Sequence, residues 1–144
     1  LKLLRGGYAM PDSAQESIDS FHRWNDAWNE GDVEKQILEM HFPHIRLDGQ
    51  NSFATIETAD DFRASQPAIK ARLEKENWHH TSTLSIHAAQ AGPEKVHLII
   101  RQSRQHEDNT EYHGFDTLWV FTKIDGRWGT QCRSSFLSVT LVGG

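Results

Sequence analysis

The chain has 144 residues, of which 37% are hydrophobic and 24% charged, and its formal net charge is −5. This length suits one domain that buries a core of its own. The negative charge and the lack of a basic stripe argue against nucleic acid as a partner, because phosphates are bound by clustered Lys and Arg. The single cysteine, Cys132, cannot form an internal disulfide, which indicates a reducing compartment.

Residues 1–10 read LKLLRGGYAM and contain no apolar stretch long enough for a signal peptide or a membrane span. We expect them to form a disordered or loosely packed N-terminal extension, and residues 11–144 to form a single domain. No membrane partner is expected, and the cytoplasm is the expected location.

The first predicted helix follows Pro11, where Ser13 and Glu16 are spaced as a capping box. Gly31 is a natural stop for this helix, and Asp32 is placed to cap a short second one. Apolar residues recur at helical spacing along the first helix. They are Ile18, Phe21, Trp24 or Asn25, and Trp28.

Alternation puts His44, Arg46 and Asp48 on one face of the next element, a hairpin that turns after Asp48. Pro43 suggests that the first strand of this hairpin lies at a sheet edge. With His41 these residues form a polar cluster. The cluster matches neither an H-x-H nor an H-E-x-x-H motif, so no metal ligands are predicted.

Thr58 opens a third helical stretch that extends to about Asn77. We expect it to break near residues 65–66, because Pro67 lacks an amide hydrogen and suits the first turn of a new helix.

Four strand-like segments separated by short turns follow from residue 78 onward. They read WHHTSTLSIHAA, KVHLIIRQSR, EYHGFDTLWVFTK and RWGTQCRSSFLSV. The order is helix, helix, hairpin, helix and antiparallel meander. This order predicts an α+β domain in which helices cover one face of a curved sheet.

From Ser13 to Phe136 the chain resembles the nuclear transport factor 2-like superfamily, in its SnoaL-like branch of small bacterial proteins. The resemblance lies in the aromatic first helix with WNEGD, the W-H-H opening of the long strands, and the closing DGRWGTQCRSSF. It implies a cone-shaped α+β barrel with an interior pocket, and helices packed on the concave face of a curved, mainly antiparallel sheet. It also implies frequent dimerisation through the outer sheet face. The superfamily includes isomerases, dehydratases, cyclases, epoxide hydrolases and non-catalytic binding modules, so no single reaction follows.

The turns decide which face each strand residue takes. A two-residue turn at residues 125–126 pairs Asp116 with Ser135 and puts Asp116 on the pocket face, diagonal to Arg133. A type I turn with a bulge at its glycine would instead turn the last strand over. In that register Trp128 joins the core and Arg133 points outward.

Turns centred near residues 92 and 108 would place Arg104 across from both His80 and Tyr112. With the two-residue turn, the outer face of the last two strands then carries an aromatic patch. Such a patch predicts a homodimer through this face. Its members are Phe115, Trp119, Phe121 and Phe136.

Asp116 is the predicted general base of the pocket. Arg133 would hold its charge state and polarise an oxygen, and His80 or Tyr112 would relay protons. Alternatively, Asp116 and Arg133 form a structural ion pair. The expected ligand-binding residues are Trp24, Trp28, Trp78, Arg104, Leu118 and Gln131.

We therefore expect a cofactor-independent acid/base enzyme of the isomerase, dehydratase, cyclase or hydratase type that acts on a small apolar molecule. The alternative is a non-catalytic dimeric module that binds a ligand or a protein. A deep, open pocket with Asp116 at its floor would favour the enzyme. A pocket filled by Trp24, Trp28 and Trp78 would favour the binding module.

Overall fold

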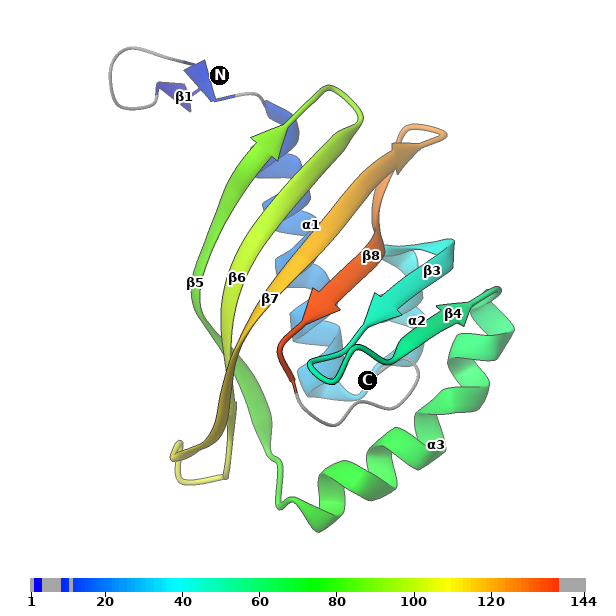
Figure 1. Ribbon diagram of the computed structural model, residues 1–144, viewed down its shortest axis with the longest axis vertical. Coiled ribbons are helices and arrows are strands. Elements are labelled where there is room, and N and C mark those ends of the chain that lie inside the picture. The colour runs from blue at the N-terminus through cyan, green and yellow to red at the C-terminus, as the bar shows by residue number, and fades with distance from the viewer. Residues whose placement is uncertain (1, 4–8, 11, 138–144) are drawn as a thin grey trace.

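The computed structural model describes residues 2–3, 9–10 and 12–137. A curved, six-stranded, mainly antiparallel sheet carries helices on its concave face (Figure 1). The strands lie in the order β4-β3-β8-β7-β6-β5, and the sheet is not closed into a barrel. The predicted α+β architecture is confirmed. The elements are α1 (Asp12–Glu30), α2 (Val33–Leu38), β3 (Met40–Leu47), β4 (Phe53–Ile56), α3 (Ala59–Lys75), β5 (His80–Ala91), β6 (Lys95–Gln105), β7 (Glu111–Ile124) and β8 (Arg127–Ser135).

Within the N-terminal segment, β1 (Lys2–Leu3) pairs with β2 (Ala9–Met10) as a separate antiparallel sheet. The disorder expected for the rest of residues 1–10 falls on residues 1 and 4–8, which lie outside the described residues. None of the helices in the described ranges is both long enough and apolar enough to cross a membrane.

The core lies between α1 and the concave face of the sheet. Phe21 and Trp24 of α1 meet Trp119 of β7 edge-on, with ring centroids 4.9 Å apart in both pairs. Full burial of each large apolar side chain contributes roughly 1.5–3 kcal/mol, so this contact anchors α1 to the sheet. The aromatic members of the core are Phe21, Trp24, Trp28, Phe62, Trp119, Phe121 and Trp128.

The ends of the first two helices follow the sequence signals in part. Gly31 ends α1 with a φ of 72°, a conformation that glycine adopts without strain. Asp32 caps α2, since its Oδ1 accepts a hydrogen bond from the amide of Lys35 at 3.0 Å. The expected capping box is wrong, because α1 begins at Asp12. Ser13 therefore lies inside the helix, and its buried Oγ has no hydrogen-bond partner among the described residues.

The expected break before Pro67 is also wrong, because α3 continues through it. Pro67 is exposed and removes one backbone hydrogen bond from the helix. Phe62, Ile69 and Leu73 are buried along one side of α3 and hold both halves against the same core. Thr58 caps the start of α3, as its position predicted.

β3 is an inner strand and not the edge strand that Pro43 suggested. It pairs antiparallel with β4 and parallel with β8. Pro43 lies in an irregular stretch of the β3–β8 pairing, between the pairs Met40–Thr130 and Ile45–Cys132. Proline is tolerated inside a sheet at such an irregularity, where the ladder does not require its missing amide hydrogen.

The last hairpin combines both registers that the sequence allowed. The two-residue turn at residues 125–126 is confirmed, with φ values of 52° and 75°. Gln131 is then an extra residue in the pairing with β7, and such a bulge reverses the faces beyond it. As a result Trp128 and Arg133 are both buried on the concave side.

β7 faces the opposite way from the prediction. Arg104 pairs with His113 and not with Tyr112, because Tyr112 is an extra residue in the pairing with β6. A shift of one residue reverses every side chain of a strand. The expectation that Asp116 points into the pocket is therefore wrong. Its side chain is 66% exposed on the outer face, with Oδ1 at 3.4 Å from Nη1 of Arg101.

The same reversal removes the predicted aromatic patch. Phe115, Trp119 and Phe121 are buried, and of its four members Phe136 alone is exposed, at 74%. Leu118 lies on the outer face in their place, beside Asp116 on the same strand. The argument for a homodimer from an aromatic face is wrong, and the homodimer itself stays a prediction.

A substitution at Gly129 of β8 tests how closely β3 and β8 approach each other. A Cβ at this position would come within 2.7 Å of the carbonyl carbon of Met40. Gly129→Ala should therefore lower the free energy of unfolding by roughly 1–3 kcal/mol, because the two strands must move apart. Urea unfolding followed by circular dichroism measures this change. Gly92→Ala is the control, since its nearest neighbour, the Lys95 carbonyl oxygen, lies at 3.6 Å. Equal losses in the two variants would contradict the explanation.

Candidate functional site

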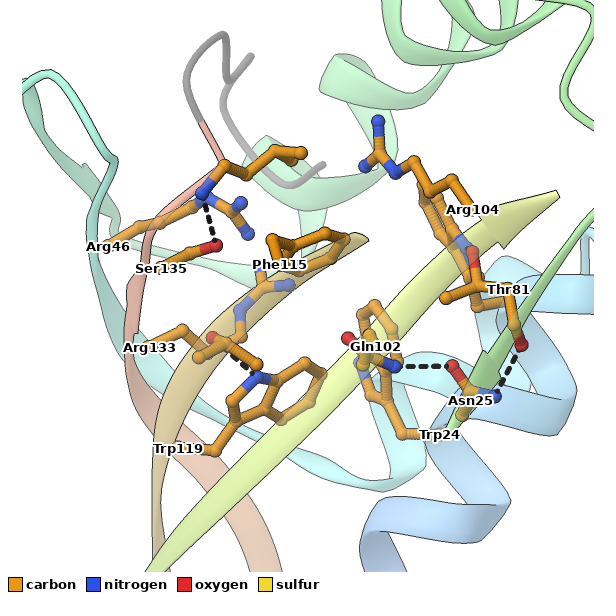
Figure 2. A pocket seen from close by; sticks show the side chains of 13 residues that line it. Trp24, Asn25, Arg46, Thr81, Gln102, Arg104, Phe115, Trp119, Arg133 and Ser135 are labelled. Atoms are coloured by element: carbon orange, nitrogen blue, oxygen red, sulfur yellow. Dashed lines mark hydrogen bonds between the residues drawn. The ribbon is translucent and has the colours of Figure 1, made fainter. Parts of the chain in front are cut away.

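A small cavity lies between α1 and the concave face of the sheet (Figure 2). Its volume is about 30 Å³, and a single water molecule needs roughly 10–15 Å³ of such space. The cavity therefore holds about two waters or the polar part of a small ligand. Its aromatic walls are Trp24, Trp28, Phe115 and Trp119, and its charged residues are Arg46, Arg104 and Arg133. No carboxylate is among the described residues that line it.

Arg133 is the most deeply buried of the three arginines, with 2% of its surface exposed. Its guanidinium carbon lies 5.2 Å from the ring centroid of Trp24 and 5.1 Å from that of Trp119, a cation–π contact with each ring. Its Nε donates a hydrogen bond to Nε2 of His44 at 2.9 Å. Its Nη2 has no hydrogen-bond partner within the described part of the chain. Burial lowers the pKa of Arg133 to about 9, so the group is positively charged at neutral pH.

His44 is neutral and has both ring nitrogens engaged. Its Nδ1 lies 3.1 Å from the carbonyl oxygen of Thr130, which can only accept a hydrogen bond. The proton is therefore on Nδ1, and Nε2 accepts from Arg133. Burial holds the pKa of His44 well below its usual range, and the charges of Arg133 and Arg46 lower it further. His44 orients Arg133 and is not available as a base.

Arg46 and Arg104 add two buried positive charges beside the same cavity. Burial is the main reason that the pKa of each guanidinium is lowered, and the charge of Arg133 adds to the effect on Arg46. Each has a carboxylate in its surroundings. The charge of Asp48 acts to raise the pKa of Arg46 and so opposes the effect of burial. Oε2 of Glu76 lies 3.9 Å from Nη1 of Arg104. The Nε of both arginines is buried without a hydrogen-bond partner among the described residues.

A chain of amides lines another side of the cavity (Figure 2). Nδ2 of Asn25 donates to the carbonyl oxygen of Thr81 at 3.1 Å, and Nε2 of Gln102 donates to Oδ1 of Asn25 at 3.1 Å. Thr81 also accepts at its Oγ1 from the indole nitrogens of Trp28 and Trp78, at 3.1 and 2.9 Å. These bonds fix α1 to β5 and β6 and hold the polar wall in place.

Four of the predicted site residues, Trp24, Trp28, Arg104 and Arg133, line the cavity. Trp78 packs edge-on against Trp28, with ring centroids 5.6 Å apart, and lies outside it. Trp78 lines instead a groove of about 680 Å³ bordered by α3 and by the ends of α1 and α2. The groove is larger, but the buried charges face the cavity, which is therefore the stronger candidate site.

The predicted proton relays lie away from the cavity. Nε2 of His80 is 2.8 Å from Oε1 of Gln105. Tyr112, the extra residue of β7, stacks on His106 with centroids 4.8 Å apart. Burial raises the pKa of Tyr112 to about 12, so its hydroxyl keeps its proton at neutral pH.

Three predicted residues are on the outer face of the sheet because of the bulges in β7 and β8. Asp116 pairs there with Arg101, and Leu118 lies two residues further along the strand. Gln131 is the bulge residue of β8, and its Oε1 accepts a hydrogen bond from Oγ1 of Thr122 at 2.9 Å. None of the three contributes to the cavity.

The polar cluster predicted on β3 divides into separate contacts. Nε2 of His41 lies 2.8 Å from the carbonyl oxygen of Arg127. Oδ1 of Asp48 accepts hydrogen bonds from the amides of Gln50 and Ser52, at 2.9 and 2.8 Å. In the ranges that the structure describes, no group of three or more His, Cys, Asp or Glu side chains is placed to hold a metal ion.

Sequence reasoning missed several residues of the cavity. Phe115 and Trp119 were assigned to the outer face because of the register shift. Arg46 did leave a signal, since alternation placed it on one face with His44, and that face is buried. Gln102 left no comparable signal in the sequence.

The chemistry of the cavity follows from these contacts. It combines buried hydrogen-bond donors of positive charge with flat aromatic walls, and its described lining contains no free acid or base. Such a site attracts an anion, and its planar guanidinium groups match the geometry of a carboxylate.

No protein-family model and no curated protein matches the sequence. The structure is similar to solved structures. One is an NTF2-like protein of unknown function from Shewanella oneidensis MR-1, with a TM-score of 0.65, 15% identity, and coverage of 88% of this chain and 98% of the other. Another is an NTF2-like protein of unknown function from Pseudomonas putida KT2440, with a TM-score of 0.67, 12% identity, and coverage of 92% and 91%.

The structure is also similar to Aln2 from a Streptomyces species, with a TM-score of 0.67, 9% identity, and coverage of 88% of this chain and 91% of the other. At such identities the likeness concerns the fold. The element order and the curved sheet agree with it over nearly the whole described chain. The chain therefore has the nuclear transport factor 2-like α+β fold that its sequence resembles.

Proposed function

We propose that the cavity binds a small organic carboxylate. The observation that carries this proposal is that three buried arginines face one cavity whose described lining has no carboxylate. Burying an ion costs several kcal/mol unless a counter-charge compensates it. Among the described residues no carboxylate acts on Arg133, and the charges of Arg104 and Arg46 repel it, so a bound anion would supply the main compensation.

A carboxylate suits this site better than a larger anion. His44 occupies the Nε of Arg133, which leaves the two Nη groups to meet a ligand. The ring centroids of Trp24 and Trp119 lie 4.9 Å apart, at 5.2 and 5.1 Å from the guanidinium carbon, so the two indoles form one aromatic wall beside it. The aromatic walls would then contact the apolar part of the ligand. The volume of about 30 Å³ restricts that part to a few atoms.

Acid/base catalysis by Asp116 is not part of this proposal. A general base must come within hydrogen-bond reach of the substrate, and the Asp116 carboxylate is on the opposite face of the sheet. His44 has no free nitrogen. Of the three tryptophans expected in a filled pocket, Trp24 and Trp28 line the cavity. Trp119 lines it in place of Trp78. These features support the binding module over the enzyme.

The test compares carboxylates with their neutral amides, for example acetate with acetamide and propionate with propionamide. A carboxylate at a hundredfold excess over its Kd should stabilise the protein by about 2.7 kcal/mol, a rise in Tm of roughly 5–10 °C for a domain of this size. The amides should have no such effect. Thermal unfolding at low ionic strength measures both. Equal stabilisation by acid and amide, or by neither, would contradict the proposal.

Arg133→Met separates ligand binding from folding. The variant should lose the stabilisation by carboxylates, because the central positive charge is gone. Without ligand it should still fold, since removal of a buried charge offsets the loss of the hydrogen bond to His44 and of the two cation–π contacts. Arg101→Met, on the outer face, is the matched control and should keep the response to carboxylates. A response retained by Arg133→Met would exclude Arg133 as the carboxylate site.

The lowered pKa of His44 predicts a pH dependence of stability. Below about pH 6.5 the unfolded chain takes up a proton on His44 and the folded protein does not. Above that pH, His44 has no effect on the free energy of unfolding. Below it, His44 lowers the free energy of unfolding by up to about 1.4 kcal/mol per pH unit. His44→Asn, which can still donate to Thr130, should flatten the stability profile between pH 6.5 and 5 in urea unfolding. His87→Asn, an exposed control on β5, should not. Identical profiles for wild type and His44→Asn would refute the assignment.

A further inference from the structure

The orientation of the Gln102 amide follows from one backbone carbonyl. The carbonyl oxygen of Thr81 can only accept, so Nδ2 of Asn25, at 3.1 Å, must face it. Oδ1 of Asn25 then faces Gln102 and accepts from its Nε2 at 3.1 Å. The Oε1 of Gln102 therefore points away from Asn25, and Figure 2 shows it directed into the cavity. Asn29 fixes the start of this chain, because it bonds both the carbonyl and the amide of Thr81, at 3.0 and 2.8 Å.

Gln102 thereby presents an acceptor in a cavity whose charged groups are all donors. Its side chain is buried, with 4% of the residue exposed, and no described residue donates to Oε1. Among the hydroxyls that line the cavity, Oγ1 of Thr117 donates to the carbonyl oxygen of Ser134 at 3.2 Å. Those of Thr81 and Ser135 accept hydrogen bonds, from the indoles of Trp28 and Trp78 and from the amide of Leu137.

A buried acceptor of this kind selects for a donor on the ligand. An ammonium group would be a donor, but three neighbouring guanidinium charges would repel it. A hydroxyl donates without adding a charge. We infer that the ligand is a small hydroxy acid, with its carboxylate at Arg133 and its hydroxyl donating to Oε1 of Gln102. This inference rests on the proposed carboxylate site and makes Gln102 the residue that determines specificity.

The test uses pairs of acids that differ by one hydroxyl: glycolate and acetate, lactate and propionate, 3-hydroxybutyrate and butyrate. Isothermal titration calorimetry on the full chain gives the Kd of each. In the pair whose geometry matches the cavity, the wild type should bind the hydroxy acid roughly tenfold more tightly, the usual worth of one neutral hydrogen bond. Glycine and alanine should bind no better than acetate and propionate.

Gln102→Met keeps the length of the side chain and removes the acceptor. It should bind both members of that pair with the affinity that the wild type has for the plain acid. Gln105→Met, three residues along β6 and outside the cavity, is the matched control and should keep the preference. Comparison of the wild-type affinities does not depend on either variant folding.

The outcomes separate the two proposals. If the wild type binds both members of every pair equally and Arg133→Met binds none, the inference about the hydroxyl is overturned and the carboxylate site stands. If no acid of either kind binds, the carboxylate site fails and the hydroxy acid with it. A hydroxyl preference that survives in Gln102→Met would exclude Gln102 as its source.

Discussion

The burial of the Arg133 guanidinium against Trp24 and Trp119 is the constraint on which the interior depends. The two indoles, packed edge-on against each other, both contact the cation, and His44 accepts one of its hydrogens. This arrangement ties α1, β7, β8 and β3 to a single group. It also requires a neutral imidazole, since a second positive charge in contact with Arg133 would be costly at this depth. The same contacts of Arg133 therefore determine both the packing of the core and the charge of the cavity.

The order and type of the main elements could be predicted from the sequence, because helical periodicity, cap residues and turn residues are local signals. Gly31, Asp32 and the turn at residues 125–126 behave as their chemistry predicts. The pairing partners of β3 could not be predicted in this way. Its parallel contact with β8 joins residues far apart in the chain, and no local pattern encodes such a contact.

The site was predicted less well, because its residues depend on strand register. Extra residues at Leu84, Ala89, Tyr112 and Gln131 interrupt the pairing of β5, β7 and β8. Each bulge exchanges the two faces of a strand beyond it. Asp116 therefore points outward and Trp119 points into the core, the reverse of the expectation. Arg133 was placed correctly because two shifts fall between it and β6 and cancel. Bulges have weak sequence signatures outside glycine, which is why alternation alone could not locate them.

The parallel pairing of β3 with β8 has a consequence for synthesis of the chain on the ribosome. His44 and its partner Arg133 are 89 residues apart. At about 5–20 residues per second, β3 leaves the ribosome several seconds before the strand that will cover its edge. During that interval His44 lacks its partner Arg133, and the edge of β3 is open to pairing with other chains. Charged side chains on an open strand oppose such pairing, so we expect Arg46 to limit misassembly of the nascent chain until the last hairpin forms.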